Sequence, residues 1–302
     1  MKFTLGKQGW LALALSISSS AWGATPFDQC PTQAFLVQDS VPRMYGVDLS
    51  TGYVRLLADN LGTSGKFNGI GFNYSNGLIY GWSYEHRTLA RLGSDLIVEP
   101  ISLANTLDDN YFVGDVSVDG NFYYAYKRGT GGSHGLWRIA LQEDHPDHLR
   151  PIRVIDGASL NLKIYDFAFH PDNGLMYSVT NLGNLVSIDP ATGTSSLIAD
   201  LQEPGVYGAV YFDVDGRLYI SRNTDGSIFQ VIPDAAEPNA LQYASGPNSG
   251  QNDGARCALA PVVSVDQSTI DFGDAPDTYG TTLAANGARH NTENSLLWMG
   301  TT

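Results

Sequence analysis

Basic residues and cysteines are scarce in this sequence, and each shortage excludes something. The 302 residues include 17 Lys and Arg against 31 Asp and Glu, which gives a formal net charge of −14. A chain this acidic repels phosphate backbones and anionic membrane surfaces, so we expect it to bind no nucleic acid. The only two cysteines, Cys30 and Cys257, leave no paired C-x-x-C motif.

Local catalytic motifs are also missing. The sequence contains no G-x-S-x-G, no H-E-x-x-H and no G-x-G-x-x-G that follows a strand and opens a helix. The GTSGKF segment at Gly62 has a Gly-Lys pair without the spacing of a phosphate-binding loop. We therefore expect no enzyme and predict no catalytic residue; the alternative is a catalytic site assembled from distant segments of the chain.

Long hydrophobic runs are absent, and the one apolar run near the start is short. It covers residues 10–17 (WLALALSI), follows a basic start, and precedes the small-x-small sequence at 21–23. A bilayer span needs about 20 apolar residues, so we expect no transmembrane segment. The pattern predicts a signal peptide over residues 1–23, cut between Gly23 and Ala24, and a secreted or cell-surface protein. The alternative is a buried N-terminal helix.

A repeat is present in the turns. An apolar strand, a polar turn ending in Gly and a second strand containing Tyr recur as FNYSNGLIYGWS, VSVDGNFYYAY, FAFHPDNGLMYSVT and YFDVDGRLYISRN. Their glycines, at 77, 120, 174 and 216, are 43, 54 and 42 residues apart. This period is typical of a four-stranded β-propeller blade. Helical periodicity is weak throughout, and a β-sandwich would not explain the regular turns.

The two ends of the repeat region predict how the ring closes. Four blades span about 67–245, while residues 34–58 hold three strands without an innermost one. Residues 253–258 (DGARCA) can supply that strand, which predicts an all-β propeller of five four-stranded blades over residues 24–261. In an oxidising compartment Cys30 and Cys257 would form a disulfide at this closure, the alternative being two free thiols.

Two parts of the sequence resemble known families of bacterial proteins. NDGARCALAP and the region 30–261 resemble an uncharacterised propeller-like domain of secreted bacterial proteins, which carries no assigned activity. DFGDAPDTYGT at 271–281, followed by GARH at 287–290, resembles the opening of GEVED-type modules in large adhesin-like surface proteins. The acidic continuation of that module is missing. The resemblance implies the N-terminal part of a longer surface protein, with residues 262–302 a linker and a disordered, truncated module start.

The innermost strands of a propeller line its axis, and aligning the blades places four polar residues at equivalent points. Carboxylate and amide oxygens suit a hard cation, so we predict a calcium site at the axis. The alternative, which the turn preference of Asp favours, is that the carboxylates cap their own backbone. The predicted metal ligands are Asn68, Asp115, Asp166 and Asp253.

Three functions remain open from the sequence. The first is a secreted, non-enzymatic interaction or adhesion module that binds an extracellular protein or glycan. The second is a metal-dependent hydrolase or lyase with its site in the central channel. The third is a carbohydrate-binding propeller with aromatic stacking, although most aromatics are expected to pack between blades. The aromatic candidates are Trp82, Tyr84, Tyr123, Tyr124, Tyr126 and Trp137.

Overall fold

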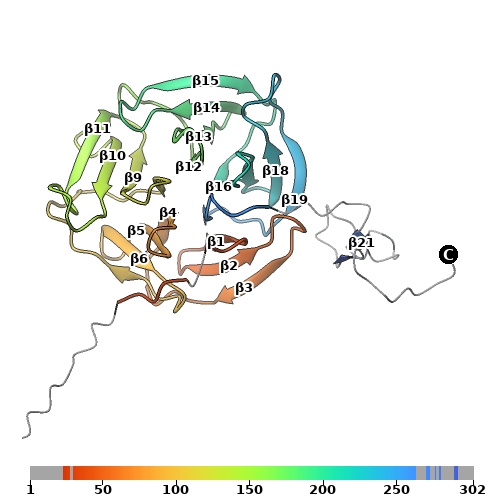
Figure 1. The fold of residues 1–302 in the computed structure, drawn as a ribbon, viewed down its shortest axis with the longest axis horizontal. Helices are drawn as coiled ribbons and strands as arrows, with labels where there is room; N and C mark the ends of the chain where they lie inside the picture. Colours follow the sequence, from red (N-terminus) through yellow and green to blue (C-terminus); the bar gives the residue numbers. More distant parts are fainter. Residues whose placement is uncertain are drawn as a thin grey trace, which may run out of the picture.

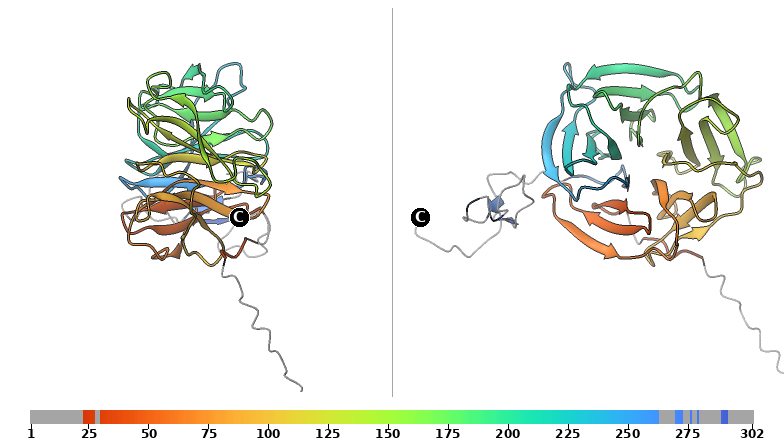
Figure 2. Two further views of the ribbon diagram at one scale, coloured as in Figure 1. Left: turned by 90° about the vertical axis from the view of Figure 1, so that its left-hand side faces the viewer. Right: turned by 180° about the vertical axis from the view of Figure 1, so that it is seen from behind.

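Five four-stranded antiparallel sheets stand around a central axis like the blades of a propeller (Figure 1). The side view shows a flat disc (Figure 2). This confirms the predicted all-β fold with five blades. The residues described by the computed structural model are 23–27, 30–262, 270–272, 276, 279 and 289–291.

Each blade begins with a strand at the axis and ends with one at the rim. From axis to rim, blade 1 contains β20 (Asn252–Ala255), β1 (Ala34–Gln38), β2 (Arg43–Val47) and β3 (Val54–Ala58). Blade 2 contains β4 (Phe67–Asn73), β5 (Leu78–Ser83), β6 (Thr88–Leu92) and β7 (Glu99–Pro100). Blade 3 contains β8 (Val113–Val116), β9 (Phe122–Lys127), β10 (Gly135–Ala140) and β11 (Pro151–Asp156).

The last two blades follow the same order. Blade 4 contains β12 (Ala168–Phe169), β13 (Met176–Val179), β14 (Asn184–Ile188) and β15 (Ser195–Asp200). Blade 5 contains β16 (Tyr207–Phe212), β17 (Leu218–Arg222), β18 (Ser227–Val231) and β19 (Leu241–Ser245).

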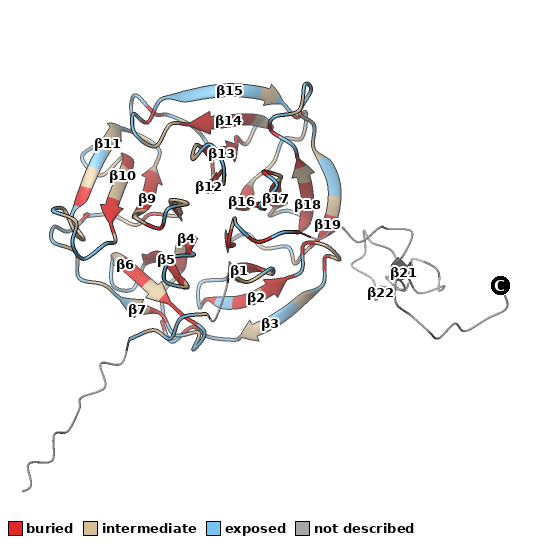
Figure 3. Cartoon of the chain, in the orientation of Figure 1, coloured by how far each residue is buried: buried red, intermediate tan, exposed pale blue. Residues whose placement is uncertain are grey.

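Burial falls from the axis to the rim, and the strand sequences follow this gradient (Figure 3). All six residues of β16 (YGAVYF) are buried, because inner strands are covered on both faces by neighbouring blades. The rim strand β15 (SSLIAD) is mostly exposed. Large side chains such as Trp82 and Phe167 fill the spaces between blades, and burying each one contributes about 2–3 kcal/mol.

The repeated glycines lie in the turns between the first and second strands of blades 2 to 5. Each has a positive φ, from 68° to 73°, which a residue with a Cβ adopts only with strain. This conformational requirement explains why the sequence repeat is visible at these positions. The four glycines are Gly77, Gly120, Gly174 and Gly216.

Blade 1 joins the two ends of the described ring. Strand β20 pairs antiparallel with β1, and Phe35 lies opposite Ala255. The chain cannot connect these strands by a turn, because more than 200 residues separate them. A disulfide between Cys30 and Cys257 lies where the other blades have their glycine turn, with the two Cα atoms 5.5 Å apart. The predicted closing strand and disulfide are thus confirmed.

Beyond the ring, β21 (Ile270–Phe272) and β22 (Arg289–Asn291) form an antiparallel pair. The pairing joins the start of the DFGDAPDTYGT motif to the end of the GARH motif. Most of residues 262–302, where disorder is expected, lie outside the described residues. Nearly all of the predicted signal peptide over 1–23 also lies outside them. Among the described residues, no helix is long and apolar enough to cross a membrane.

Candidate functional site

The four predicted metal ligands all lie at the axis, on the inner strands of four different blades. Asn68 lies in β4, Asp115 in β8 and Asp253 in β20, while Asp166 comes two residues before β12. Asp166 and Asp253 are fully buried. Asp115 is partly buried and lines a small cavity of about 20 Å³, which is room for about one water molecule.

Each axial aspartate accepts two backbone N–H groups, one from the residue that follows it and one from the next blade. Asp166 Oδ1 accepts from Phe167 at 2.8 Å, and its Oδ2 accepts from Val210 in blade 5 at 2.7 Å. Asp115 does the same with Val116 at 2.7 Å and with Phe169 in blade 4 at 3.1 Å.

Asp253 repeats the arrangement at the closing blade. Its Oδ1 accepts the N–H of Gly254 at 2.7 Å, and its Oδ2 accepts that of Gly69 in blade 2. The three carboxylates therefore link blade 1 to 2, blade 3 to 4 and blade 4 to 5. We call them the axial latches. The expectation that these aspartates cap their own backbone accounts for one of the two hydrogen bonds that each accepts; the other comes from the next blade.

Tyrosine hydroxyls connect the two remaining blade junctions. Asn68 does not reach blade 3, since its Oδ1 accepts the N–H of its own neighbour Gly69 at 3.0 Å. Instead, Tyr123 of blade 3 donates to the Gly69 carbonyl at 2.7 Å. Tyr211 of blade 5 donates to the carbonyl of Phe35 in blade 1 at 3.4 Å. Sequence alignment of the blades missed these two residues because they lie on strand positions without a carboxylate counterpart.

Burial dominates the electrostatics of the axial latches. It raises the pKa of Asp115 to about 8, against the opposing effect of the Val116 and Phe169 N–H groups. The pKa values of Asp166 and Asp253 are also raised, first by burial and then by the charges of the neighbouring aspartates. Like charges gathered in a low-dielectric channel favour protonation, or a bound cation, over three free carboxylates.

A calcium ion needs six to eight oxygen ligands. All six carboxylate oxygens of the axial latches already accept an N–H group. Within the described ranges, no group of three or more His, Cys, Asp or Glu side chains is arranged to hold a metal ion. The calcium site with Asn68, Asp115, Asp166 and Asp253 therefore stays a prediction.

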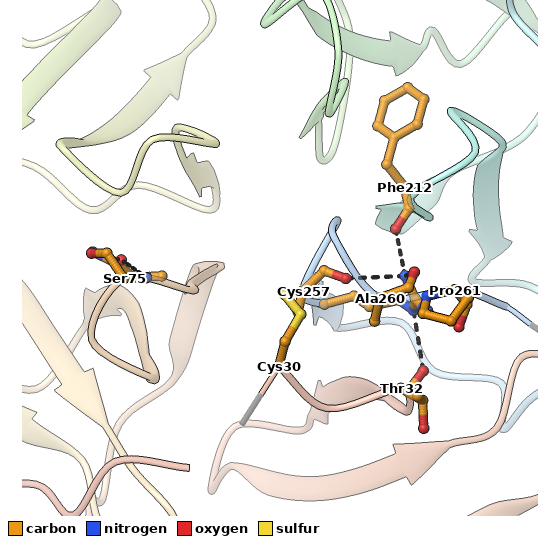
Figure 4. The surroundings of a disulfide bond; sticks show 9 residues. Cys30, Thr32, Ser75, Phe212, Cys257, Ala260 and Pro261 are labelled. Carbon is orange, nitrogen blue, oxygen red and sulfur yellow. Dashed lines mark hydrogen bonds between the residues drawn. A yellow bond between two sulfur atoms is a disulfide. The ribbon is translucent and has the colours of Figure 1, made fainter. Parts of the chain in front are cut away.

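Arg256 holds the chain after the closing strand, a role that no local sequence pattern indicates. It is buried, and burial lowers its pKa to about 10. Figure 4 shows the disulfide together with the residues whose backbone carbonyl oxygens accept hydrogen bonds from Arg256. The guanidinium donates to the backbone carbonyl oxygens of Thr32, Phe212, Cys257, Ala260 and Pro261, at 2.8 to 3.3 Å.

A groove of about 470 Å³ lies over blades 3 and 4, on the face that carries the glycine turns. Tyr74 from blade 2 is one of its lining residues and is 42% exposed. Asp119 and Asp172 add carboxylates. We call this surface the turn groove, and its lining is Tyr74, Ser117, Val118, Asp119, Phe122, Tyr124, Phe169, Pro171, Asp172, Asn173, Gly174 and Pro190.

Most of the aromatic candidates for sugar stacking are packed away. Trp82 and Tyr123 are completely buried, and Trp82 meets the Tyr111 ring edge-on with centroids 4.9 Å apart. Tyr126 is buried and donates to two carbonyls in the loop before blade 4. Tyr84 and Trp137 are only partly buried, and Tyr124 alone among the candidates lines the turn groove.

The ring and its latches define the chain as a five-bladed β-propeller. Residues 35–259 match the family described as "Repeat of unknown function (DUF6923)", and the chain belongs to that family. A search of curated proteins found no match.

Several solved structures match this chain at low identity. A protein of unknown function from Bacteroides thetaiotaomicron VPI-5482 is 16% identical, with a TM-score of 0.43, over 70% of this chain and 64% of its own. A nidogen/laminin complex is 13% identical, with a TM-score of 0.47, over 76% of this chain and 83% of its own. A gluconolactonase from Xanthomonas campestris is 15% identical, with a TM-score of 0.46, over 74% of this chain and 79% of its own. At these identities the likeness concerns the fold alone.

Proposed function

We propose that this chain is an exported, non-enzymatic interaction module that binds an extracellular protein through the turn groove. The observation that carries the proposal is the groove itself, in which an exposed Tyr74 ring stands beside the carboxylates of Asp119 and Asp172. Exposed aromatic side chains beside a cavity are typical anchors of protein–protein interfaces. The carboxylates favour a basic segment of the partner by charge complementarity.

The enzyme alternative requires the axial aspartates to face a substrate or a metal. Asp166 and Asp253 are fully buried, and each of their oxygens accepts a backbone N–H. A hydrolase or lyase would have to break these hydrogen bonds to free a carboxylate, which costs about 1–3 kcal/mol for each orphaned N–H. These contacts support a scaffold at the axis over a metal-dependent hydrolase or lyase.

The proposal includes a place in a larger surface protein. The DFGDAPDTYGT and GARH motifs are similar to the opening of GEVED-type modules, and their ends pair as β21 and β22. Asp271 lies opposite His290, and Phe272 lies opposite Arg289. A local pairing of these two motifs supports a module start that follows the propeller, and we propose that the propeller is presented on the cell surface in this way.

The test compares Tyr74→Ala with Tyr53→Ala. Tyr53 is 61% exposed and is absent from the lining of the turn groove, so its substitution is the matched control. Binding of the labelled mature protein to an array of extracellular proteins is measured. We expect Tyr74→Ala to weaken the strongest signal at least tenfold, and Tyr53→Ala to leave it unchanged. Equal binding by wild type and Tyr74→Ala would show that the turn groove is not the interface.

Carbohydrate binding is the second candidate, and the same groove favours it. An exposed Tyr74 ring can stack on a sugar face, while Asp119 and Asn173 offer hydrogen-bonding groups close by. A glycan array with the same two variants separates the candidates. Glycan signals lost in Tyr74→Ala identify a carbohydrate-binding propeller, whereas an array at background level rejects this candidate.

A further inference from the structure

Residues 24–27 lie as a strap across the rim and turns of blade 2. The N–H of Ser94 donates to the carbonyl of Thr25 at 2.7 Å, and the N–H of Phe27 donates to that of Gly77 at 2.8 Å. The Phe27 ring packs between blades 1 and 2, with its centroid 4.9 Å from that of Phe35. We call residues 24–27 the N-terminal strap.

Two glycines of blade 2 make room for the N-terminal strap. A Cβ on Gly93 would collide with the Thr25 carbonyl oxygen, and one on Gly77 would lie 2.7 Å from the Phe27 carbonyl oxygen. The backbone of blade 2 therefore fits the strap at both ends. This close fit fixes the position of the strap's first residue, Ala24, on the described structure.

The Ala24 nitrogen faces a carboxylate. It lies 3.1 Å from Glu99 Oε2 in β7, which also accepts Arg91 Nε from β6 at 2.7 Å. Tyr80 of β5 is a further titratable group close to Arg91. Only Oε2 of Glu99 is used by these two donors, so the carboxylate has capacity for a further N–H. Such a site suits a group with several N–H donors and a positive charge.

We infer that Glu99 is the receptor for the α-ammonium group that forms when a signal peptidase cuts between Gly23 and Ala24. Hydrolysis adds one water across this peptide bond, so Gly23 leaves with a carboxylate and the Ala24 nitrogen becomes an ammonium. The ammonium keeps its 3.1 Å contact with Glu99 and gains charge and two further N–H donors. Processing thus fastens the N-terminal strap to blade 2. The inference rests on the export assumed in the proposed function.

The experiment starts from the full 302-residue chain, expressed in an exporting bacterium and purified from outside the cytoplasm. Intact mass and N-terminal sequencing are expected to find Ala24 as the first residue. A chain found only in the cytoplasm, with residues 1–23 still attached, overturns both the export and this inference. A chain that is exported but cut at another bond overturns this inference alone.

The ion pair is then tested on the processed protein. Acetylating the α-amino group removes its charge and keeps one N–H, which we expect to lower the melting temperature by about 2 °C. In Glu99→Gln, acetylation is expected to leave the melting temperature unchanged. The same variant is expected to lower the pKa of the Ala24 amino group, which is measured by NMR titration after selective isotope labelling of that group. The matched control is Glu143→Gln at an exposed loop position, in which acetylation should act as in wild type. An acetylation effect and amino pKa that are equal in wild type and Glu99→Gln would refute the ion pair.

Discussion

Among single residues, the axial aspartates show how a buried carboxyl group can serve a fold. Each one accepts an N–H from its own strand and, through its other oxygen, an N–H from the next blade. Inner strands at these points have backbone donors that no sheet partner satisfies. A buried donor without a partner is costly, and the carboxylates remove that cost.

Asp166→Ala tests this role most simply. The substitution orphans the N–H groups of Phe167 and Val210, and we expect a loss of about 2–4 kcal/mol in the free energy of unfolding. Urea denaturation at neutral pH measures the loss, and hydrogen exchange of the Val210 amide should speed up. The control Asp144→Ala, at an exposed loop position, should change stability by less than about 0.5 kcal/mol. An unchanged or more stable Asp166→Ala protein would mean that this carboxyl is not kept for the fold.

The raised pKa of Asp115 predicts an unusual pH dependence. Because burial raises this pKa to about 8 in the folded protein, the folded state holds a proton that the unfolded chain releases near pH 4. Stability contributed at this site is therefore full in acid and falls as pH rises from about 4 to 8. Relative to Asp115→Asn, wild type should lose about 1–3 kcal/mol between pH 5 and pH 7 in urea denaturation. Parallel pH profiles of the two proteins would contradict the assignment.

The glycine turn is the element that recurs in blades 2 to 5. At Gly174 the backbone strain that a side chain would add in this turn can be measured separately from any steric clash. This residue has a φ of 68°, and a Cβ built on it would meet no atom within 4 Å. Gly174→Ala therefore adds backbone strain without a collision, and we expect a loss of about 1 kcal/mol. Gly132→Ala is the control, since it has equally open surroundings and no left-handed φ. Thermal unfolding of both variants decides, and equal melting temperatures would show that the turn conformation is not what requires glycine.

The strands could be predicted well where local chemistry determines them. Gly77, Gly120, Gly174 and Gly216 mark the turns because their φ values demand glycine, and the apolar runs beside them become inner strands. The rim strand β7 (Glu99–Pro100) is only two residues long. Rim strands have one partner and little burial, so their sequences carry a weak signal.

Over the whole molecule, ring closure was predictable and the contacts between blades were not. The strand DGARCA and the two cysteines are visible in the chain and predict the fifth blade. The link from Asp166 to Val210 depends on how neighbouring blades face one another, which no local pattern encodes. Asn68 occupies the aligned position, and its Oδ1 accepts the N–H of its own neighbour Gly69, a contact that alignment of the blades does not show.

The disulfide should matter most for the stability of the ring. Cys30 and Cys257 are 227 residues apart, so in the loop-entropy description their bond stabilises the fold by about 5 kcal/mol. The double variant with Cys30→Ser and Cys257→Ser is expected to unfold at a markedly lower temperature, with wild type in reductant behaving alike. Coincident melting curves with and without reductant would show that β1–β20 pairing closes the ring unaided.

The axial aspartates link neighbouring blades through hydrogen bonds to backbone N–H groups, and we expect the folded protein to need no metal ion at the axis. Native mass spectrometry of the exported protein, before and after EDTA and with and without reductant, checks this expectation. We predict a mass two hydrogens below that of the reduced chain, unchanged by EDTA. A stoichiometric calcium ion that EDTA removes, and that Asp253→Asn no longer binds, would contradict this expectation and make the axis a metal site.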